Sequence, residues 1–282
     1  DTVLTFELIE NQLEISALKF QADFSTLPVG DFPVTEIQEF EREVALPGKE
    51  LSDLIEKTSF AMASQDVRYY LNGILLEVSP SQINVVATDG HRLAWSSCKI
   101  KTDFTDEKII IPRKSALELQ KLLNLYPENV NIAFNSNQLK VFSDEYTFIS
   151  KLIEGSYPDY EKVFPKGTEQ KLKANKSLVQ TALNRAAVLS NEKYRGVKFI
   201  LEKDNLKICA NNPSKESAEE EVLVEYSGDS FEIGFNISYV QESLSVISNN
   251  EVEFVFFGSE NSCLVKNIDD ESLIHVIMPM RL

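Results

Sequence analysis

Histidine and cysteine are scarce in this sequence, which has two histidines and three cysteines among 282 residues. Cys98, Cys209 and Cys263 are odd in number and far apart, which makes a poor disulfide framework and is typical of a reducing compartment. No two of them have the spacing of metal ligands, and two histidines leave little to complete a site. We therefore expect no metal and no cofactor, and interpret the cysteines as small core or surface residues.

The sequence also lacks the common motifs of enzymes. It has no Gly-x-Ser-x-Gly elbow, no Gly-x-x-x-x-Gly-Lys phosphate loop and no Gly-x-Gly-x-x-Gly fingerprint. His91, with Asp89 close to it, is the one tempting general base. We predict that the protein is not an enzyme. An enzyme that uses His91 stays open as an alternative, without a substrate to propose.

Long apolar runs are missing too. None approaches the roughly 18 to 20 apolar residues that cross a bilayer, and no secretory leader opens the sequence. The chain begins with Asp1 rather than Met, so we expect that an N-terminal portion has been removed or is not included. These features predict a cytoplasmic protein that does not enter a membrane.

Positive charge is the last deficit, since 28 Lys and Arg face 44 Asp and Glu, for a formal net charge of −16. This total argues against nucleic acid, because phosphate affinity comes from Lys and Arg. Net charge does not say where the cations lie, however. They gather on or beside three predicted helices, at Lys49 and Lys57, at Arg113, Lys114 and Lys121, and at Lys176, Arg185, Lys193 and Arg195. Ordinary solvated helix faces explain this pattern, and so do helices that line a channel and face DNA.

An internal repeat organises what is present. Asn-Gln-Leu-Glu-Ile at 11–15 is echoed by Asn-Gln-Leu-Lys-Val at 137–141, and Phe32-Pro33 by Tyr157-Pro158. The period of about 125 residues is that of a whole domain. We predict three copies, the first of them mostly missing, with boundaries at 1–43, 44–165 and 166–282.

Each complete copy shows the same order of elements. A helix follows Pro47-Gly48, strands follow it, a second helix opens at Pro112 as its first residue, and closing strands end the copy. In the next copy, Ser238 and Gln241 suggest a capping box for the second helix. The acidic residues 216–221 are interpreted as a loop. Two helices and about eight strands per copy predict an α+β fold, with the helices packed on antiparallel sheets.

Two segments stand out for binding. Residues 87–94 read Ala-Thr-Asp-Gly-His-Arg-Leu-Ala, which predicts a strand that ends in a tight turn and presents His91 to Leu93. Residues 278–282 read Met-Pro-Met-Arg-Leu, where flexible methionines suit a surface with several partners and Pro279 marks an edge or a strand end. A buried last strand is the plainer interpretation. A groove for a short peptide is the functional one.

These two segments, together with 66–73, 156–160, 189–193 and 233–236, resemble signatures of the bacterial sliding DNA clamp, the beta subunit of DNA polymerase III. The resemblance covers the whole chain. It implies the DNA-clamp fold and a non-catalytic processivity factor of DNA replication. In that family two subunits of three domains close head-to-tail into a ring around duplex DNA, with the helices inside and an acidic exterior.

The resemblance also implies partners. The DNA polymerase III alpha subunit, the clamp loader, other polymerases and repair proteins would insert short linear motifs into a cleft between the second and third domains. The matching cleft positions are Leu71, Thr88, Gly90, His91, Arg92, Leu93, Pro158, Lys162, Val163, Tyr194, Asn236, Tyr239, Val276, Met278, Pro279, Met280 and Arg281. Apolar side chains would bury the motif, while His91, Arg92 and Arg281 would supply polar contacts.

Further positions follow from the same resemblance. Those that would face DNA are Lys49, Gln65, Tyr69, Tyr70, Arg113, Lys114, Lys121 and Arg185. Those of the dimer interface are Lys19, Val188, Leu189, Glu216, Glu219 and Glu220. Because most of the first domain is lacking, we expect this chain to be largely monomeric and the full-length protein to dimerise. A scaffold of the same fold without a peptide cleft stays open as an alternative.

Overall fold

The computed structural model describes residues 2–33, 38–40, 42–102, 105–268 and 270–281. The chain separates into two units, 1–39 and 40–282, which are treated one at a time. The first unit is an antiparallel meander of β1 (Thr5–Ile9), β2 (Gln12–Ala17) and β3 (Phe20–Ser25), followed by the 3-10 turn η1 (Val29–Asp31). Tight turns at Glu10 and Leu18, both with positive φ, join its strands. The predicted meander is confirmed.

The second unit contains the two complete copies. The first copy begins with a strand and a helix and continues through four strands, a second helix and three strands: β4 (Glu43–Pro47), α1 (Gly48–Ser59), β5 (Gly73–Val78), β6 (Gln82–Thr88), β7 (Arg92–Lys99), β8 (Glu107–Pro112), α2 (Arg113–Leu125), β9 (Asn129–Phe134), β10 (Gln138–Phe142) and β11 (Thr147–Lys151). Two 3-10 turns, η2 (Tyr69–Leu71) and η3 (Tyr160–Val163), lie before β5 and after β11.

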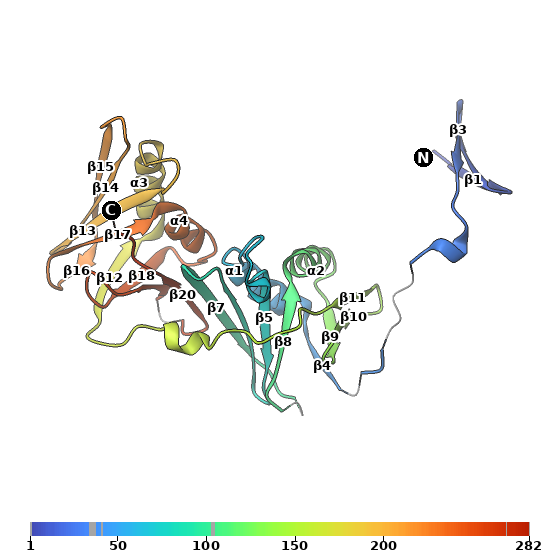
Figure 1. Cartoon of the computed structure of the whole chain (residues 1–282), viewed down its shortest axis with the longest axis horizontal. Helices are drawn as coiled ribbons and strands as arrows, with labels where there is room; N and C mark the ends of the chain where they lie inside the picture. Colours follow the sequence, from blue (N-terminus) through green and yellow to red (C-terminus); the bar gives the residue numbers. More distant parts are fainter. Residues whose placement is uncertain (1, 34–37, 41, 103–104, 269, 282) are drawn as a thin grey trace. The chain divides into compact units, whose positions relative to one another are not determined.

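The second copy repeats this order with one short extra strand. Its elements are β12 (Gln170–Asn175), α3 (Lys176–Val188), β13 (Gly196–Glu202), β14 (Asn205–Asn211), β15 (Ser217–Leu223), β16 (Glu225–Tyr226), β17 (Phe231–Asn236), α4 (Ile237–Ser245), β18 (Glu251–Phe256), β19 (Cys263–Asn267) and β20 (Leu273–Ile277). Figure 1 shows α1 beside α2 in the first copy and α3 beside α4 in the second. The predicted α+β class and the pair of helices per copy are confirmed.

One sheet runs through both copies. Its strand order is β16-β12-β18-β19-β20-β7-β6-β5-β8, so the last strand of the second copy pairs with β7, an outer strand of the four from the first copy. The pairing is antiparallel, with Val276 opposite Leu93 and Ile277 opposite Arg92. Two four-stranded sheets, β11-β10-β9-β4 and β15-β14-β13-β17, complete the copies. The backbone ladder between β20 and β7 therefore fixes the relative position of the two signature segments.

Amphipathic helices cover these sheets. In α1, Leu51, Leu54, Ile55 and Thr58 recur at helical spacing and are all buried. This apolar stripe faces the core, as expected for a helix packed on a sheet. Each copy has its own core, and a smaller cluster joins them with Leu75, Val86, Leu93, Ile110, Tyr160 and Val276.

Three local expectations are wrong. Pro112 precedes α2, which begins at Arg113. The helix α4 is capped by Asn236, whose side chain accepts a hydrogen bond from the Ser238 backbone, so there is no capping box at Ser238 and Gln241. Finally, the acidic residues at 219–221 lie in the edge strand β15 instead of a loop. Glu219 and Glu221 are exposed on that strand, and charges on an edge strand are a common way to protect a sheet edge.

Candidate functional site

The turn between β6 and β7 is closed by its own side chains. The Thr88 hydroxyl accepts a hydrogen bond from the Gly90 backbone (3.1 Å) and donates one to the Arg92 carbonyl (2.6 Å). The Asp89 carboxylate accepts from the backbones of His91 (2.9 Å) and Arg92 (3.1 Å). Gly90 has a φ of 89°, which a side chain rarely adopts. The predicted tight turn is confirmed, and it holds His91 at the surface.

The C-terminal segment lies against this turn. The Met278 backbone donates to the His91 carbonyl (3.0 Å), and the Met280 backbone donates to the carbonyl of Gly234 on β17, the edge strand of a neighbouring sheet (2.9 Å). Since β20 ends at Ile277, Pro279 follows the strand as expected. The two segments singled out in the sequence are thus hydrogen-bonded neighbours.

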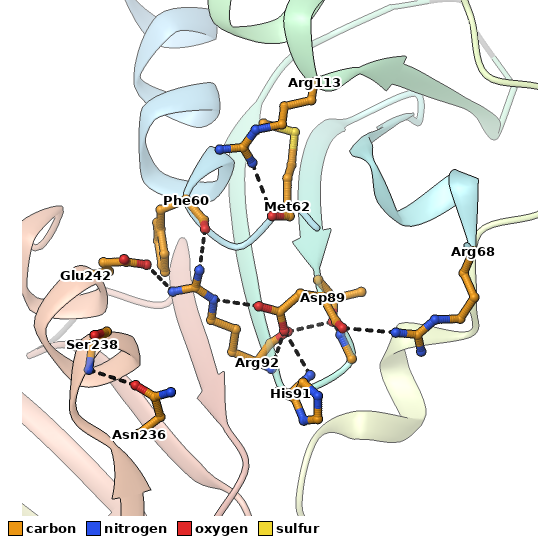
Figure 2. A network of polar contacts seen from close by, with 12 residues as sticks. Phe60, Met62, Arg68, Asp89, His91, Arg92, Arg113, Asn236, Ser238 and Glu242 are labelled. Carbon is orange, nitrogen blue, oxygen red and sulfur yellow. Dashed lines mark hydrogen bonds and ion pairs between the residues drawn. The ribbon is translucent and has the colours of Figure 1, made fainter. Parts of the chain in front are cut away.

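Arg92 connects the two copies through what we call the Arg92 network. Its Nε donates to Asp89 (3.0 Å) and its Nη2 to the Phe60 carbonyl at the end of α1 (2.7 Å). Its Nη1 forms an ion pair with Glu242 on α4, and the guanidinium lies 4.4 Å from the centre of the Tyr239 ring. Figure 2 shows Asp89, Phe60 and Glu242 converging on the guanidinium. The Arg92 side chain is only 10% exposed, so its charge is offset by partners from both copies.

His275 makes a second connection between the copies, which the sequence did not reveal. Its Nε2 donates to the Lys57 carbonyl of α1 (3.1 Å), and its ring meets Phe60 edge-on, with 5.1 Å between centroids. Burial, together with the nearby positive charges of Arg92 and Lys57, lowers the pKa of this fully buried histidine from 6.5 to about 4. His275 is therefore neutral at ordinary pH and carries its proton on Nε2.

Three hollows are lined by residues of the His91 turn or of the C-terminal segment. One of about 680 Å³ is lined by residues of both copies, among them His91, Arg92 and Tyr239. A second, of about 630 Å³, includes Tyr194, Met280 and Arg281. A third, of about 530 Å³, is lined in part by Pro279, Met280 and Arg281.

Apart from half-buried Arg92, the predicted cleft residues fall into three groups. Leu71, Leu93 and Val276 are buried and can only form a floor. Val163 packs, half-buried, on the junction cluster that contains Leu93 and Val276. Those at or near the surface are Thr88, Gly90, His91, Pro158, Lys162, Tyr194, Asn236, Tyr239, Met278, Pro279, Met280 and Arg281. None of the three hollows is lined by all of the predicted cleft residues. That these residues form one peptide-binding cleft stays a prediction.

Two polar members of that set are committed to internal contacts. The Arg92 guanidinium is held by the network just described, and the Asn236 side chain caps α4. Lys162 forms an exposed ion pair with Asp159 (2.7 Å), which lowers the pKa of Asp159. A contact between Arg92 and a partner stays a prediction, whereas its structural role is visible.

Some of the residues predicted to face DNA lie close to one another, and others lie on separate elements. Gln65, Arg113, Lys114 and Lys121 line a hollow of about 690 Å³ between α2 and the loop before β5. In that loop, hydrogen bonds from Arg68 lower the pKa of Asp66 to about 2.

The other positions in this group lie on three further elements. Tyr69 and Tyr70, on η2, meet edge-on with 5.8 Å between ring centroids, and Tyr69 is exposed. Lys49 on α1 pairs with Asp53, and Arg185 lies on α3.

The predicted dimer-interface residues lie mostly at one edge of the second copy. Val188, at the end of α3, is 79% exposed, and Glu219 and Glu220 lie on β15. Arg185 of α3 pairs with Glu220 (3.3 Å), so a predicted DNA-facing residue contacts a predicted interface residue. The remaining members are half-buried Leu189 and exposed Glu216 and Lys19, the last of these in the first unit.

The described residues offer little for catalysis or metal binding. No cluster of three or more His, Cys, Asp or Glu side chains within them could hold a metal ion. Burial raises the pKa of the Cys98 thiol to about 11 and also raises that of Cys209, which disfavours the nucleophilic thiolates. Within the same ranges, no helix has the length and apolar character needed to cross a membrane.

Comparison with known proteins gives a consistent result. The family model of the DNA polymerase III beta subunit matches with its central domain over residues 45–159 and its C-terminal domain over 161–281. The beta sliding clamp of Pseudomonas aeruginosa is 43% identical over the whole chain, which spans 77% of that protein. The clamp of Escherichia coli is 42% identical over 92% of the chain and 70% of its own length.

Solved structures agree with these relatives. The crystal structure of the DNA polymerase sliding clamp from Pseudomonas aeruginosa with ligand has a TM-score of 0.96 and 43% identity, over 100% of this chain and 77% of that one. Another, of the Pseudomonas aeruginosa clamp bound to griselimycin, has the same score, identity and coverage. The chain therefore belongs to the family of bacterial beta sliding clamps, the non-catalytic processivity subunits of DNA polymerase III in DNA replication.

Proposed function

We propose that this chain, within its full-length head-to-tail dimer, encircles duplex DNA, slides along it and tethers the replicative polymerase. Other polymerases, repair proteins and the clamp loader use the same peptide-binding cleft between the second and third domains. The single observation that carries the cleft is the pairing of β20 with β7, which places the Met278 segment against the His91 turn. Membership of the clamp family supports the other parts of the proposal, namely the ring around DNA, the sliding and the partners.

Binding by a ring explains the charge distribution. A closed ring holds DNA by topology, so individual phosphate contacts can stay weak while sliding stays fast. Exposed cations on α1 and α2 supply such contacts, although the whole chain is acidic. Tyr69, exposed beside this surface, suits stacking on an unpaired base. The bacterial cytoplasm is the compartment this function requires.

The proposed cleft combines an apolar floor with polar walls. Leu93 and Val276 lie beneath it, and Met278, Pro279 and Tyr239 are partly exposed beside it. Apolar side chains of a partner motif would gain about 25 cal/mol for each Å² that they remove from water. His91 and Arg281, both exposed, are placed to fix the direction of the peptide.

A fluorescent peptide of the Gln-Leu-x-Leu-Phe type tests the cleft directly. We expect saturable micromolar binding by polarisation, weakened about tenfold by Met278→Ala, which corresponds to about 1.4 kcal/mol. His91→Ala should also weaken it. Leu125→Ala is the control, because Leu125 is 72% exposed at the far end of α2. A well-folded chain that does not bind the peptide would contradict the proposed cleft.

Sedimentation tests the proposed interface. In the full-length protein, Val188→Asp should shift the dimer towards monomer, because it places a charge in an apolar contact at the exposed end of α3. Leu125→Asp is the matched control, since Leu125 is similarly exposed, at 72%, and ends α2 of the first copy as Val188 ends α3. An unchanged dimer in the Val188 variant would remove Val188 from the interface.

A further inference from the structure

We propose that Glu242 is a positioning residue for the partner cleft, acting through Arg92 to hold α4 against the turn that carries His91. This inference rests on the proposed function, because it concerns the geometry of the same cleft. Glu242 itself is not among the residues expected to touch a partner. Its importance comes from the guanidinium with which it pairs.

The first step is the environment of that guanidinium. Arg92 is 10% exposed, and its three nitrogens have one partner each: the Asp89 carboxylate, the Phe60 carbonyl and the Glu242 carboxylate. Two of these partners belong to the first copy and only Glu242 to the second. Without the Glu242 carboxylate, Nη1 loses its charged partner and the charge–charge connection to the second copy is lost. A nearly buried cation tolerates such a loss poorly.

The second step is the position of Glu242 on its helix. Tyr239 and Glu242 are three residues apart on α4, so they share one face of it. Both contact the same guanidinium, one through the ring and the other through the carboxylate. The ion pair therefore sets how close the Tyr239 face of α4 lies to the turn. Figure 2 shows Glu242 and Asp89 approaching Arg92 from different elements.

The third step connects this face to the rest of the cleft. Residue 91 directly precedes Arg92, and its carbonyl accepts the Met278 backbone (3.0 Å). Thus α4, the turn and the C-terminal segment meet at one arginine. Loss of the Glu242 carboxylate should loosen Tyr239 relative to His91 and Met278, and it should raise the dissociation rate of a bound peptide.

The test compares Glu242→Gln with Glu169→Gln. Both variants replace an ion-paired glutamate of the second copy, and the two acids are similarly exposed, at 47% and 49%. Glu169 pairs with Lys171, which is not a cleft residue. We expect Glu242→Gln to weaken binding of the Gln-Leu-x-Leu-Phe peptide about fivefold, mainly through faster dissociation, and Glu169→Gln to leave it unchanged.

Two further measurements separate positioning from general stability. In a double-mutant cycle, Arg92→Lys alone should weaken peptide binding. Adding Glu242→Gln to Arg92→Lys should weaken peptide binding only slightly more, because both changes break the Arg92 network. The Arg92 Nε–H signal in an NMR spectrum of the peptide-free chain should shift in Glu242→Gln and not in Glu169→Gln. Unfolding in urea reports any loss of stability separately.

The outcomes are distinct. Wild-type affinity in Glu242→Gln, or fully additive losses in the cycle, would overturn the positioning role. A lower fraction of active protein with an unchanged dissociation constant would also overturn it, because only stability would then have changed. Absence of binding by the wild-type chain would overturn the proposed cleft, and this inference with it.

Discussion

The buried histidine at the junction predicts how stability depends on pH. The pKa of His275 is lowered in the folded protein from 6.5 to about 4, first by burial and then by the positive charges of Arg92 and Lys57. Between these values the unfolded chain binds a proton that the folded chain does not. Stability is therefore complete above about pH 6.5 and falls as the pH drops towards 4.

The size of the effect follows from the shift. Each pH unit inside this window costs about 1.4 kcal/mol, so the loss reaches about 2 kcal/mol at pH 5. Nδ1 of His275 is buried and has no hydrogen-bond partner among the described residues, so a second proton on the ring would gain no compensating contact. The surroundings of His275 therefore disfavour the protonated ring in the folded protein. Protonation of the unfolded chain lowers the stability before the folded protein takes up the same proton.

His275→Gln provides the comparison. Glutamine keeps an N–H donor for the Lys57 carbonyl and cannot titrate in this range. In urea unfolding between about pH 7 and about pH 5, the wild-type chain should lose about 2 kcal/mol more than the variant. Carboxylates titrate in both proteins, so their contribution cancels. Equal losses in the two proteins would refute the reasoning.

Other outcomes can be checked separately. Gly90→Ala should destabilise the chain by about 1 to 3 kcal/mol in thermal unfolding, because φ is 89° and a Cβ would lie 3.0 Å from the Arg68 guanidinium; an unchanged melting temperature would contradict this. Lys114→Ala should weaken DNA binding by the full-length ring and lower the slope of its salt dependence by about 1, whereas an unchanged slope would place Lys114 away from phosphate. Tyr160→Phe should cost about 1 to 2 kcal/mol in urea, because its hydroxyl donates to nearly buried Glu77 (2.5 Å); no loss would show that this bond contributes nothing net.

Local patterns predicted the elements of the site well. The Asp89-Gly90 dipeptide predicts the turn, Pro279 predicts the end of β20, and the repeated Asn-Gln-Leu segments predict equivalent strands in different copies. Each of these signals depends on a few neighbouring residues. The local structure that they predict is therefore found in the folded chain, because distant contacts do not decide it.

Contacts between distant segments were not predictable in the same way. Phe60 and Glu242 lie 32 and 150 residues from Arg92, and no spacing rule connects them. His275 contacts the Lys57 carbonyl of α1 from 218 residues away, and no pattern in the sequence indicates this contact. The acidic stretch at 219–221 was misinterpreted as a loop, because charges in an edge strand give the same composition as charges in a loop.

The ladder between β20 and β7 constrains chain length as well as residue type. Side chains alternate between the two faces of a strand, so one residue inserted within Leu273–Ile277 would turn the following side chains to the opposite face. His275 would leave Lys57, and Met278 would lose its place against the His91 carbonyl. The turn at 257–262, between β18 and β19, has no such register to keep. Insertions and deletions should therefore accumulate in that turn and be excluded from the last strand, however conservative the inserted residue.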